Sequence, residues 1–130
     1  MAEKNYGEIY DTVSWERAMD QARTATVAGC QTFRATPDDE PGGPHALART
    51  DALAIYARTF ADGGGENGLH SHPDDAAWVV VAGHASFYAE AGAVLGELFA
   101  SDGLLVPSGT SYRFVCHGPT TLMRVAARAT

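Results

Sequence analysis

Short apolar stretches separated by turn residues fill the chain from Ala46 onward. The first, LAIYARTFA, alternates and is rich in residues that favour β-strands, and the glycine-rich segment DGGGENG ends it. Six similar segments follow, each bounded by Gly, Pro or Asp: AWVVVAG, ASFYAEAG, GELFA, GLLVPSG, SYRFVCHG and TTLMRVAA. This spacing predicts an all-β sandwich or barrel over residues 46–130. The run Val79-Val80-Val81 predicts a strand that is buried on both faces.

Residues 1–45 have a different pattern and are predicted to form an N-terminal extension. The segment SWERAMDQARTA places apolar residues at three- and four-residue spacings after Ser14, a suitable N-cap, and so predicts a short amphipathic helix. The helix would bury Trp15, Ala18, Met19 and Ala22. The segment CQTFRAT predicts a strand, and PDDEPGGP predicts a loop.

The composition and charge of the chain limit the kinds of molecule that it is expected to bind. The chain has 130 residues, the size of one domain, and a net charge of −7 with only 9 Lys and Arg. Without a basic patch, neither nucleic acid nor an anionic membrane is an expected partner, and a small molecule remains. Two cysteines make no disulfide framework, and the sequence has neither a signal-peptide pattern nor a long apolar run. We therefore expect a cytoplasmic protein with reduced thiols.

Two histidines one residue apart, in GLHSHPDD, are the main chemical signal. On a strand, side chains two residues apart point to the same face, so His70 and His72 would lie close enough to chelate one metal ion. His45 and His84 have no partner at such a spacing, and we interpret them as surface residues. Asp74 and Asp75 follow His72 and are first interpreted as parts of an ordinary Pro–Asp turn.

The histidine segment resembles the first motif of the cupins, Gly-x5-His-x-His-x3-4-Glu-x6-Gly. Gly64, His70, His72 and Gly83 fall in register with this motif, but Ala76 stands at the carboxylate position. Because an alanine side chain cannot bind a metal, one ligand that the motif normally supplies is lost.

The second cupin motif, Gly-x5-Pro-x-Gly-x2-His-x3-Asn, resembles SDGLLVPSGTSYRFVC. Pro107 and Gly109 match, whereas Ser101, Tyr112 and Cys116 replace the motif's Gly, His and Asn. The resemblance covers residues 46–130. It implies a double-stranded β-helix, or jelly-roll barrel, that forms a homodimer and holds a transition metal (Fe, Mn, Ni or Zn) on ligands that resemble three His and one Glu.

Only His70 and His72 carry over as metal ligands, so a third ligand has to be sought. If residues 112–116 form one strand, Tyr112 and Cys116 share a face and His117 points the other way. Cys116 or Tyr112 is therefore a possible third ligand, although a buried cysteine is often only a small apolar residue.

Other residues near the histidines could bind or convert a ligand without metal. Tyr112 could donate a proton to a developing oxyanion, with neutral His72 as the base. Three aromatic residues would line the barrel: Trp78, Phe87 and Phe114. Glu66 could overhang the barrel mouth, although a solvated loop residue is the simpler interpretation.

Three functions remain open at this point. The first is a metal-dependent enzyme acting on a small organic molecule, and the resemblance implies a dioxygenase, isomerase, decarboxylase or cyclase. The second is a metal-free enzyme that uses the histidines and Tyr112 for acid–base chemistry. The third is a non-catalytic barrel that binds or senses a small molecule.

Overall fold

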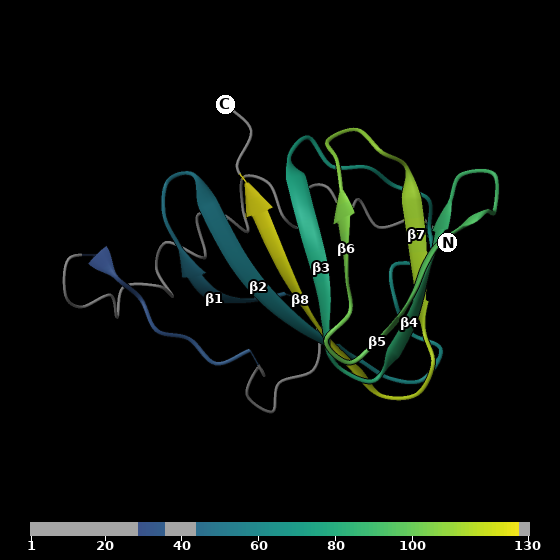
Figure 1. Cartoon of the computed structure of the whole chain (residues 1–130), viewed down its shortest axis with the longest axis horizontal. Coiled ribbons are helices and arrows are strands. Elements are labelled where there is room, and N and C mark those ends of the chain that lie inside the picture. Colours follow the sequence, from purple (N-terminus) through teal and green to yellow (C-terminus); the bar gives the residue numbers. More distant parts are fainter. Residues whose placement is uncertain (1–28, 36–43, 128–130) are drawn as a thin grey trace.

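The computed structural model describes residues 29–35 and 44–127, which form eight β-strands (Figure 1). The strands are β1 (His45–Arg49), β2 (Leu53–Phe60), β3 (Asp75–Ala82), β4 (His84–Ala89), β5 (Val94–Phe99), β6 (Gly103–Val106), β7 (Tyr112–Cys116) and β8 (Thr120–Ala127). The predicted amphipathic helix lies outside the described residues. Within the described ranges, no helix is long and apolar enough to cross a membrane.

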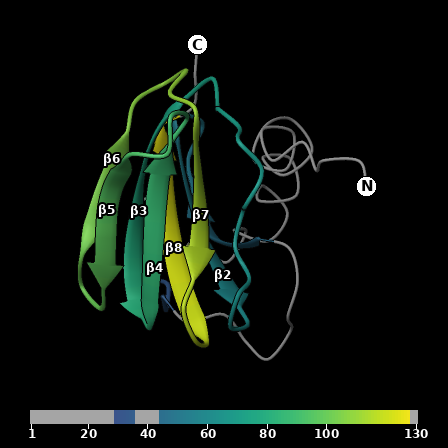
Figure 2. The ribbon, with the colours of Figure 1, turned by 90° about the vertical axis from the view of Figure 1, so that its right-hand side faces the viewer.

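The strands form two antiparallel sheets that face each other (Figures 1 and 2). One sheet has five strands in the order β1-β2-β8-β3-β6, and the other has three in the order β5-β4-β7. Each predicted strand segment after Ala46 coincides with an observed strand, and the all-β prediction is confirmed.

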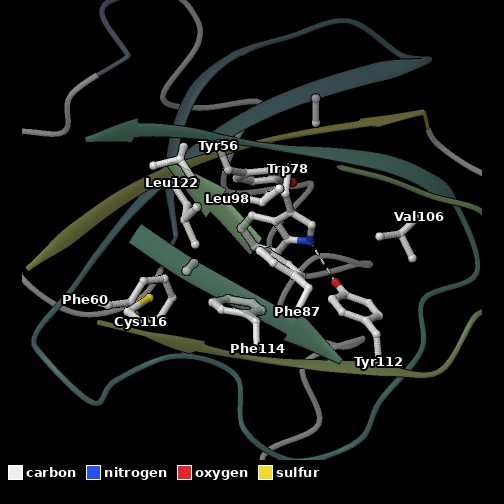
Figure 3. Close-up of a cluster of buried hydrophobic side chains, with 13 residues drawn as sticks. Tyr56, Phe60, Trp78, Phe87, Leu98, Val106, Tyr112, Phe114, Cys116 and Leu122 are labelled. Atoms are coloured by element: carbon white, nitrogen blue, oxygen red, sulfur yellow. Dashed lines mark hydrogen bonds between the residues drawn. The ribbon is translucent and has the colours of Figure 1, made fainter. Parts of the chain in front are cut away.

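The core lies between the two sheets (Figure 3). Buried and half-buried residues alternate along β7 and β8, as expected for strands with one inward face. In β3, Trp78 and Val80 are fully buried, but Val79 and Val81 are only half-buried. The prediction that this strand is buried on both faces is therefore wrong, because only one of its faces turns toward the opposite sheet.

The N-terminal side of the domain differs from the prediction in two ways. Residues 45–49 form a strand, β1, that the sequence pattern did not reveal, whereas residues 30–35 form none. Instead, the Gln31 side chain donates to the Arg49 carbonyl oxygen (2.6 Å) and accepts from the Arg49 amide (3.0 Å). Over the described residues 30–35, the Gln31 side chain bonds to the backbone of β1 in place of a strand ladder.

Candidate metal centre

The loop between β2 and β3 carries the histidine pair and runs along the edge of β7. The strand donates three backbone hydrogen bonds to it: Tyr112 N to His70 O (2.9 Å), Phe114 N to Glu66 O (3.0 Å) and Cys116 N to Gly64 O (2.7 Å). The His70 amide also donates to the Tyr112 carbonyl oxygen at 3.1 Å. The loop therefore acts as an irregular fourth strand beside β7.

Gly65 makes this close approach possible. Its φ angle is +133°, and a Cβ atom there would lie 2.4 Å from the Phe114 carbonyl oxygen. Both the conformation and the lack of space exclude a larger residue. The glycine-rich segment that ends β2 is thus required for the backbone contact that positions the loop.

Glu66 lies inside the protein and is fully buried. Its Oε2 atom lies 2.8 Å from Nη1 of Arg58, and its Oε1 atom lies 3.0 Å from Nε2 of His70. The interpretation of Glu66 as a solvated loop residue is therefore wrong. A buried carboxylate needs a cationic partner, and Arg58, itself nearly buried on β2, supplies one.

The orientation of His70 is set by a second contact. Its Nδ1 atom lies 2.7 Å from the Gly68 carbonyl oxygen, which can only accept, so Nδ1 carries a proton. In the neutral ring, Nε2 then presents a lone pair toward the Glu66 carboxylate. Two such atoms 3.0 Å apart require a proton or a metal cation between them.

His72 lies next to Tyr112 in the barrel interior, with 3.2 Å between its Nε2 and the phenol oxygen. The indole N–H of Trp78 donates to the same oxygen at 2.9 Å (Figure 3). Burial, reinforced by the positive charge of Arg124, lowers the pKa of His72 to about 3. Burial also raises the pKa of Tyr112 well above its usual value. At neutral pH both side chains are therefore uncharged.

The Pro–Asp turn after His72 also points one carboxylate inward. Asp74 is buried, and its Oδ1 lies 3.4 Å from Nη2 of Arg124, whose guanidinium lies 5.9 Å from the ring centre of Trp78. Asp75 is exposed at the start of β3 and accepts a hydrogen bond from the Ser108 amide at 2.8 Å. The predicted turn therefore lies at Pro73 and Asp74, with Asp74 in a buried ion pair, whereas Asp75 already belongs to the strand.

Glu66, His70 and His72 each place one donor atom within 4.8 Å of the other two. Two imidazoles and one carboxylate are a common ligand set for divalent transition metals, so the residues present fit such an ion. Among the His, Cys, Asp and Glu side chains that the structure describes, Glu66 is grouped with the two histidines and Cys116 is not. The Tyr112 oxygen, 3.2 Å from Nε2 of His72, stays a predicted further ligand. A carboxylate thus lies beside the two histidines, and it comes from the β2–β3 loop rather than from position 76 in β3.

The sequence matches no protein-family model and none of the curated proteins compared with it. Its structure, in contrast, is similar to several solved structures. A cupin superfamily protein from Desulfitobacterium hafniense aligns with a TM-score of 0.61 and 18% identity, over 75% of this chain and 99% of that one. An RmlC-like cupin from Shewanella frigidimarina aligns with a TM-score of 0.60 and 22% identity, over 71% and 81%.

A protein with a double-stranded β-helix domain from Klebsiella pneumoniae also aligns, with a TM-score of 0.62 and 19% identity, over 75% of this chain and 90% of that one. The chain has the cupin fold. The resemblance seen in the two sequence motifs is confirmed. The cupin barrel explains why residues from the β2–β3 loop and from β7 meet in its interior.

The other residues predicted for the site have clear positions in the cupin barrel. Trp78, Phe87 and Phe114 are fully buried in the core cluster, and their contact with a ligand stays a prediction (Figure 3). Cys116 is also in this cluster, and burial raises the pKa of its thiol to about 11. His84 is partly exposed at the surface, and its Nε2 lies 2.9 Å from Oε1 of Glu97, a partner that the sequence spacing does not reveal.

Glu66 is the site residue that sequence reasoning underrated. Its only signal was its position, four residues before His70 in a glycine-rich segment. Glycine lets the backbone approach β7 closely and turns the carboxylate inward, but this depends on a pairing with residues about 50 positions later, which a linear pattern does not show.

Proposed function

We propose that this cupin-fold chain is an enzyme that converts a small organic molecule with the help of one divalent transition-metal ion on Glu66, His70 and His72. The observation that carries the proposal is the buried contact of His70 Nε2 with Glu66 Oε1 at 3.0 Å. A metal ion satisfies both lone pairs at once, and His72 completes a set of three donors.

Such an ion, when bound, supplies a Lewis acid to which oxygen atoms of a substrate can bind. A set of two histidines and one carboxylate suits Fe, Mn, Ni or Zn and leaves open coordination positions. The reaction classes in keeping with this chemistry are those of a dioxygenase, isomerase, decarboxylase or cyclase.

The surrounding residues hold the three ligands in place. Arg58 binds Oε2 of Glu66, which leaves Oε1 directed at His70. The Gly68 carbonyl keeps the proton of His70 on Nδ1, so that Nε2 is available as a ligand atom. These contacts orient the site before any ion binds, which favours binding.

We propose that Tyr112 is the proton donor of the reaction. Its raised pKa keeps the phenol protonated at neutral pH, so it can donate to negative charge that develops on a bound molecule. The Trp78 indole N–H fixes the position of the phenol oxygen.

The contact of Tyr112 with His72 favours a second candidate, acid–base catalysis without metal. At 3.2 Å the phenol and a neutral imidazole are within proton-transfer distance. In this case His72 acts as base and Tyr112 as acid, and the buried Glu66–His70 pair is a structural ion pair. A barrel that only binds its ligand is the third possibility.

Metal analysis separates these functions. The full chain, purified without a metal-affinity tag, is expected to contain, or to take up on reconstitution with Fe²⁺, Mn²⁺, Ni²⁺ or Zn²⁺, one ion that Glu66→Gln removes. Cys116→Ser is the matched control and should retain it. Loss of the ion in Cys116→Ser but not in Glu66→Gln would overturn the ligand assignment. Absence of binding in both the native protein and the variants would overturn the metal-dependent function.

The metal-free candidate needs a separate readout. Tyr112→Phe and His72→Gln should each abolish turnover of a molecule that demonstrably binds, whether or not metal is present. If no bound molecule is turned over by the native, metal-loaded protein, both enzyme proposals fail and the binding function remains.

A further inference from the structure

A second group of histidines and a glutamate lies on the outer face of the three-stranded sheet, whose strands stand in front in Figure 2. On β4, His84 and Ser86 are two residues apart and share this face, and the sheet register places Glu97 of β5 opposite Ser86. His117 directly follows β7, and its amide donates to the His84 carbonyl oxygen at 2.9 Å. Three strands thus bring these side chains together through regular β-pairing.

Their side chains form a continuous network. Glu97 Oε1 lies 2.9 Å from His84 Nε2 and accepts a hydrogen bond from the Ser86 hydroxyl, also at 2.9 Å. Because that hydroxyl has donated its only proton, it accepts from His117 Nε2 at 2.8 Å. The ligand atoms of His84, Glu97 and His117 all lie within 4.8 Å of one another.

We propose that His84, Glu97 and His117 form a second metal site, on the barrel exterior, that binds Zn²⁺ from solvent. Two imidazole nitrogens and one carboxylate oxygen are ordinary zinc ligands, whereas Mg²⁺ and Ca²⁺ prefer oxygen ligands only. Zinc bonds of about 2.0–2.2 Å in tetrahedral geometry set neighbouring ligand atoms about 3.3–3.6 Å apart. The His84–Glu97 contact therefore has to open slightly, which exposed side chains allow.

The site is both accessible and partly organised in advance. The side chains of His84 and Glu97 are 26% and 54% exposed, so an ion can reach them directly. The Phe99 ring stacks on the His84 ring, with centroids 4.1 Å apart and planes within 12°, and holds its orientation. Ser86 is nearly fully buried and keeps Glu97 beside the two rings. Exposed ion pairs stabilise a fold little, so stability alone does not account for this arrangement.

Binding changes the protonation of the two rings in a way that can be observed. Without metal, Nε2 of His84 donates to the Glu97 carboxylate, and Nε2 of His117 donates to Ser86, so both nitrogens carry protons. In the bound form the ion occupies both Nε2 positions, and each neutral ring carries its proton on Nδ1. The imidazole ¹H–¹⁵N spectrum therefore reports the site directly.

The first experiment titrates Zn²⁺ into the metal-free, ¹⁵N-labelled full chain and follows all histidine rings. The Nε2 signals of His84 and His117 should change from the protonated to the metal-bound type, while His45 stays unchanged as an internal control. Mg²⁺ should have no effect. If Zn²⁺ shifts only His70 and His72, or none of the rings, the proposal is overturned. Since His70 and His72 are read separately, failure of the interior site does not affect this result.

The second experiment measures Zn²⁺ affinity in variants of the outer face. Ser86→Ala removes a supporting partner and should weaken outer-site binding by about 10-fold to 100-fold. Glu97→Gln and His117→Gln remove ligands and should weaken it more. His45→Gln is the matched control and should leave the affinity unchanged. Equal affinities in Glu97→Gln, His117→Gln and the native protein would overturn the proposal.

Discussion

Each of the two groups contains two histidines and one glutamate, but the fold builds them in opposite ways. The inner group, Glu66, His70 and His72, lies on an irregular loop that is held beside β7. The outer group is set by the regular register of β4 and β5 and by the end of β7. The same combination of side chains can thus arise from loop geometry inside a barrel or from strand geometry on its surface.

The difference matters because an unpaired charge destabilises the folded state more in the interior than at the surface. The carboxylate of Glu66 is fully buried, and its negative charge is balanced by Arg58. Loss of this ion pair should therefore lower the free energy of unfolding. The carboxylate of Glu97 is exposed to water, which can solvate it if its partners are removed. We therefore expect substitutions in the inner group to affect stability and those in the outer group to affect mainly ion binding.

Removing Arg58 should test this comparison most strongly. Arg58→Met leaves the Glu66 carboxylate buried without its 2.8 Å partner, and breaking a buried ion pair in this way costs about 3–5 kcal/mol. Urea unfolding of the metal-free protein should show a decrease of this size in the free energy of unfolding.

Two controls go with that measurement. The double variant Arg58→Met/Glu66→Gln should recover part of the loss, because no buried charge then remains. Glu97→Gln should barely change the urea midpoint, since its carboxylate is exposed. If Arg58→Met were as mild as Glu97→Gln, the contrast between the two groups would not hold.

The next largest effect is expected at Gly65, which lets the inner loop approach β7. In Gly65→Ala the new Cβ would meet the Phe114 carbonyl oxygen at 2.4 Å, and the positive φ alone costs about 1–3 kcal/mol. The thermal unfolding temperature should fall clearly, and the affinity of the inner group for a metal ion should weaken. Gly92→Ala also has a positive φ, of +89°, but nothing lies within 4 Å of its Cβ. Equal losses in both variants would mean that the close contact is unimportant.

Much of the fold could be predicted from the sequence because strand alternation is a local property. The segments that become β2 to β8 carry this pattern, and two degenerate motifs indicated the cupin fold. Strand β1, HALAR, was missed because it is short and follows a Pro- and Gly-rich segment. A strand was predicted over residues 30–36, but the described residues 30–35 form none. There the Gln31 side chain, rather than a ladder of backbone hydrogen bonds, bonds to β1.

The candidate sites could be predicted only where they depend on local spacing. The His70 and His72 pair is visible as a two-residue repeat. Glu66 was underrated, and the partners of His84 were missed, because both depend on residues brought together by strand pairing. The alternation of side chains along β7 correctly predicted that Cys116 faces the core and that His117 faces outward.

A smaller effect is expected from the phenol of Tyr112, which links the inner histidines to the core. Tyr112→Phe keeps the ring but removes the acceptor of the Trp78 indole N–H, and a buried donor left unsatisfied costs about 1–3 kcal/mol. Urea unfolding measures the loss, and the Trp78 indole N–H signal should move. Tyr88→Phe on the same sheet keeps the ring that Arg113 covers and should be nearly neutral. A neutral Tyr112→Phe would show that the phenol is not held by this bond.

The last effect should appear at alkaline pH and again separates the interior from the exterior. Burial raises the pKa of Cys116 from 9.0 to about 11, so between these values the unfolded chain has lost a proton that the folded chain still holds. Stability should therefore fall as the pH rises from 9 to 11, and Tyr112, whose pKa is also raised, adds to the fall above pH 10. Cys116→Ala should flatten the first part of this slope, whereas Cys30→Ala, at an exposed position, should leave it unchanged. Urea unfolding at each pH measures the slope, and an equal slope in both variants would mean that the Cys116 thiol is not shielded by the core.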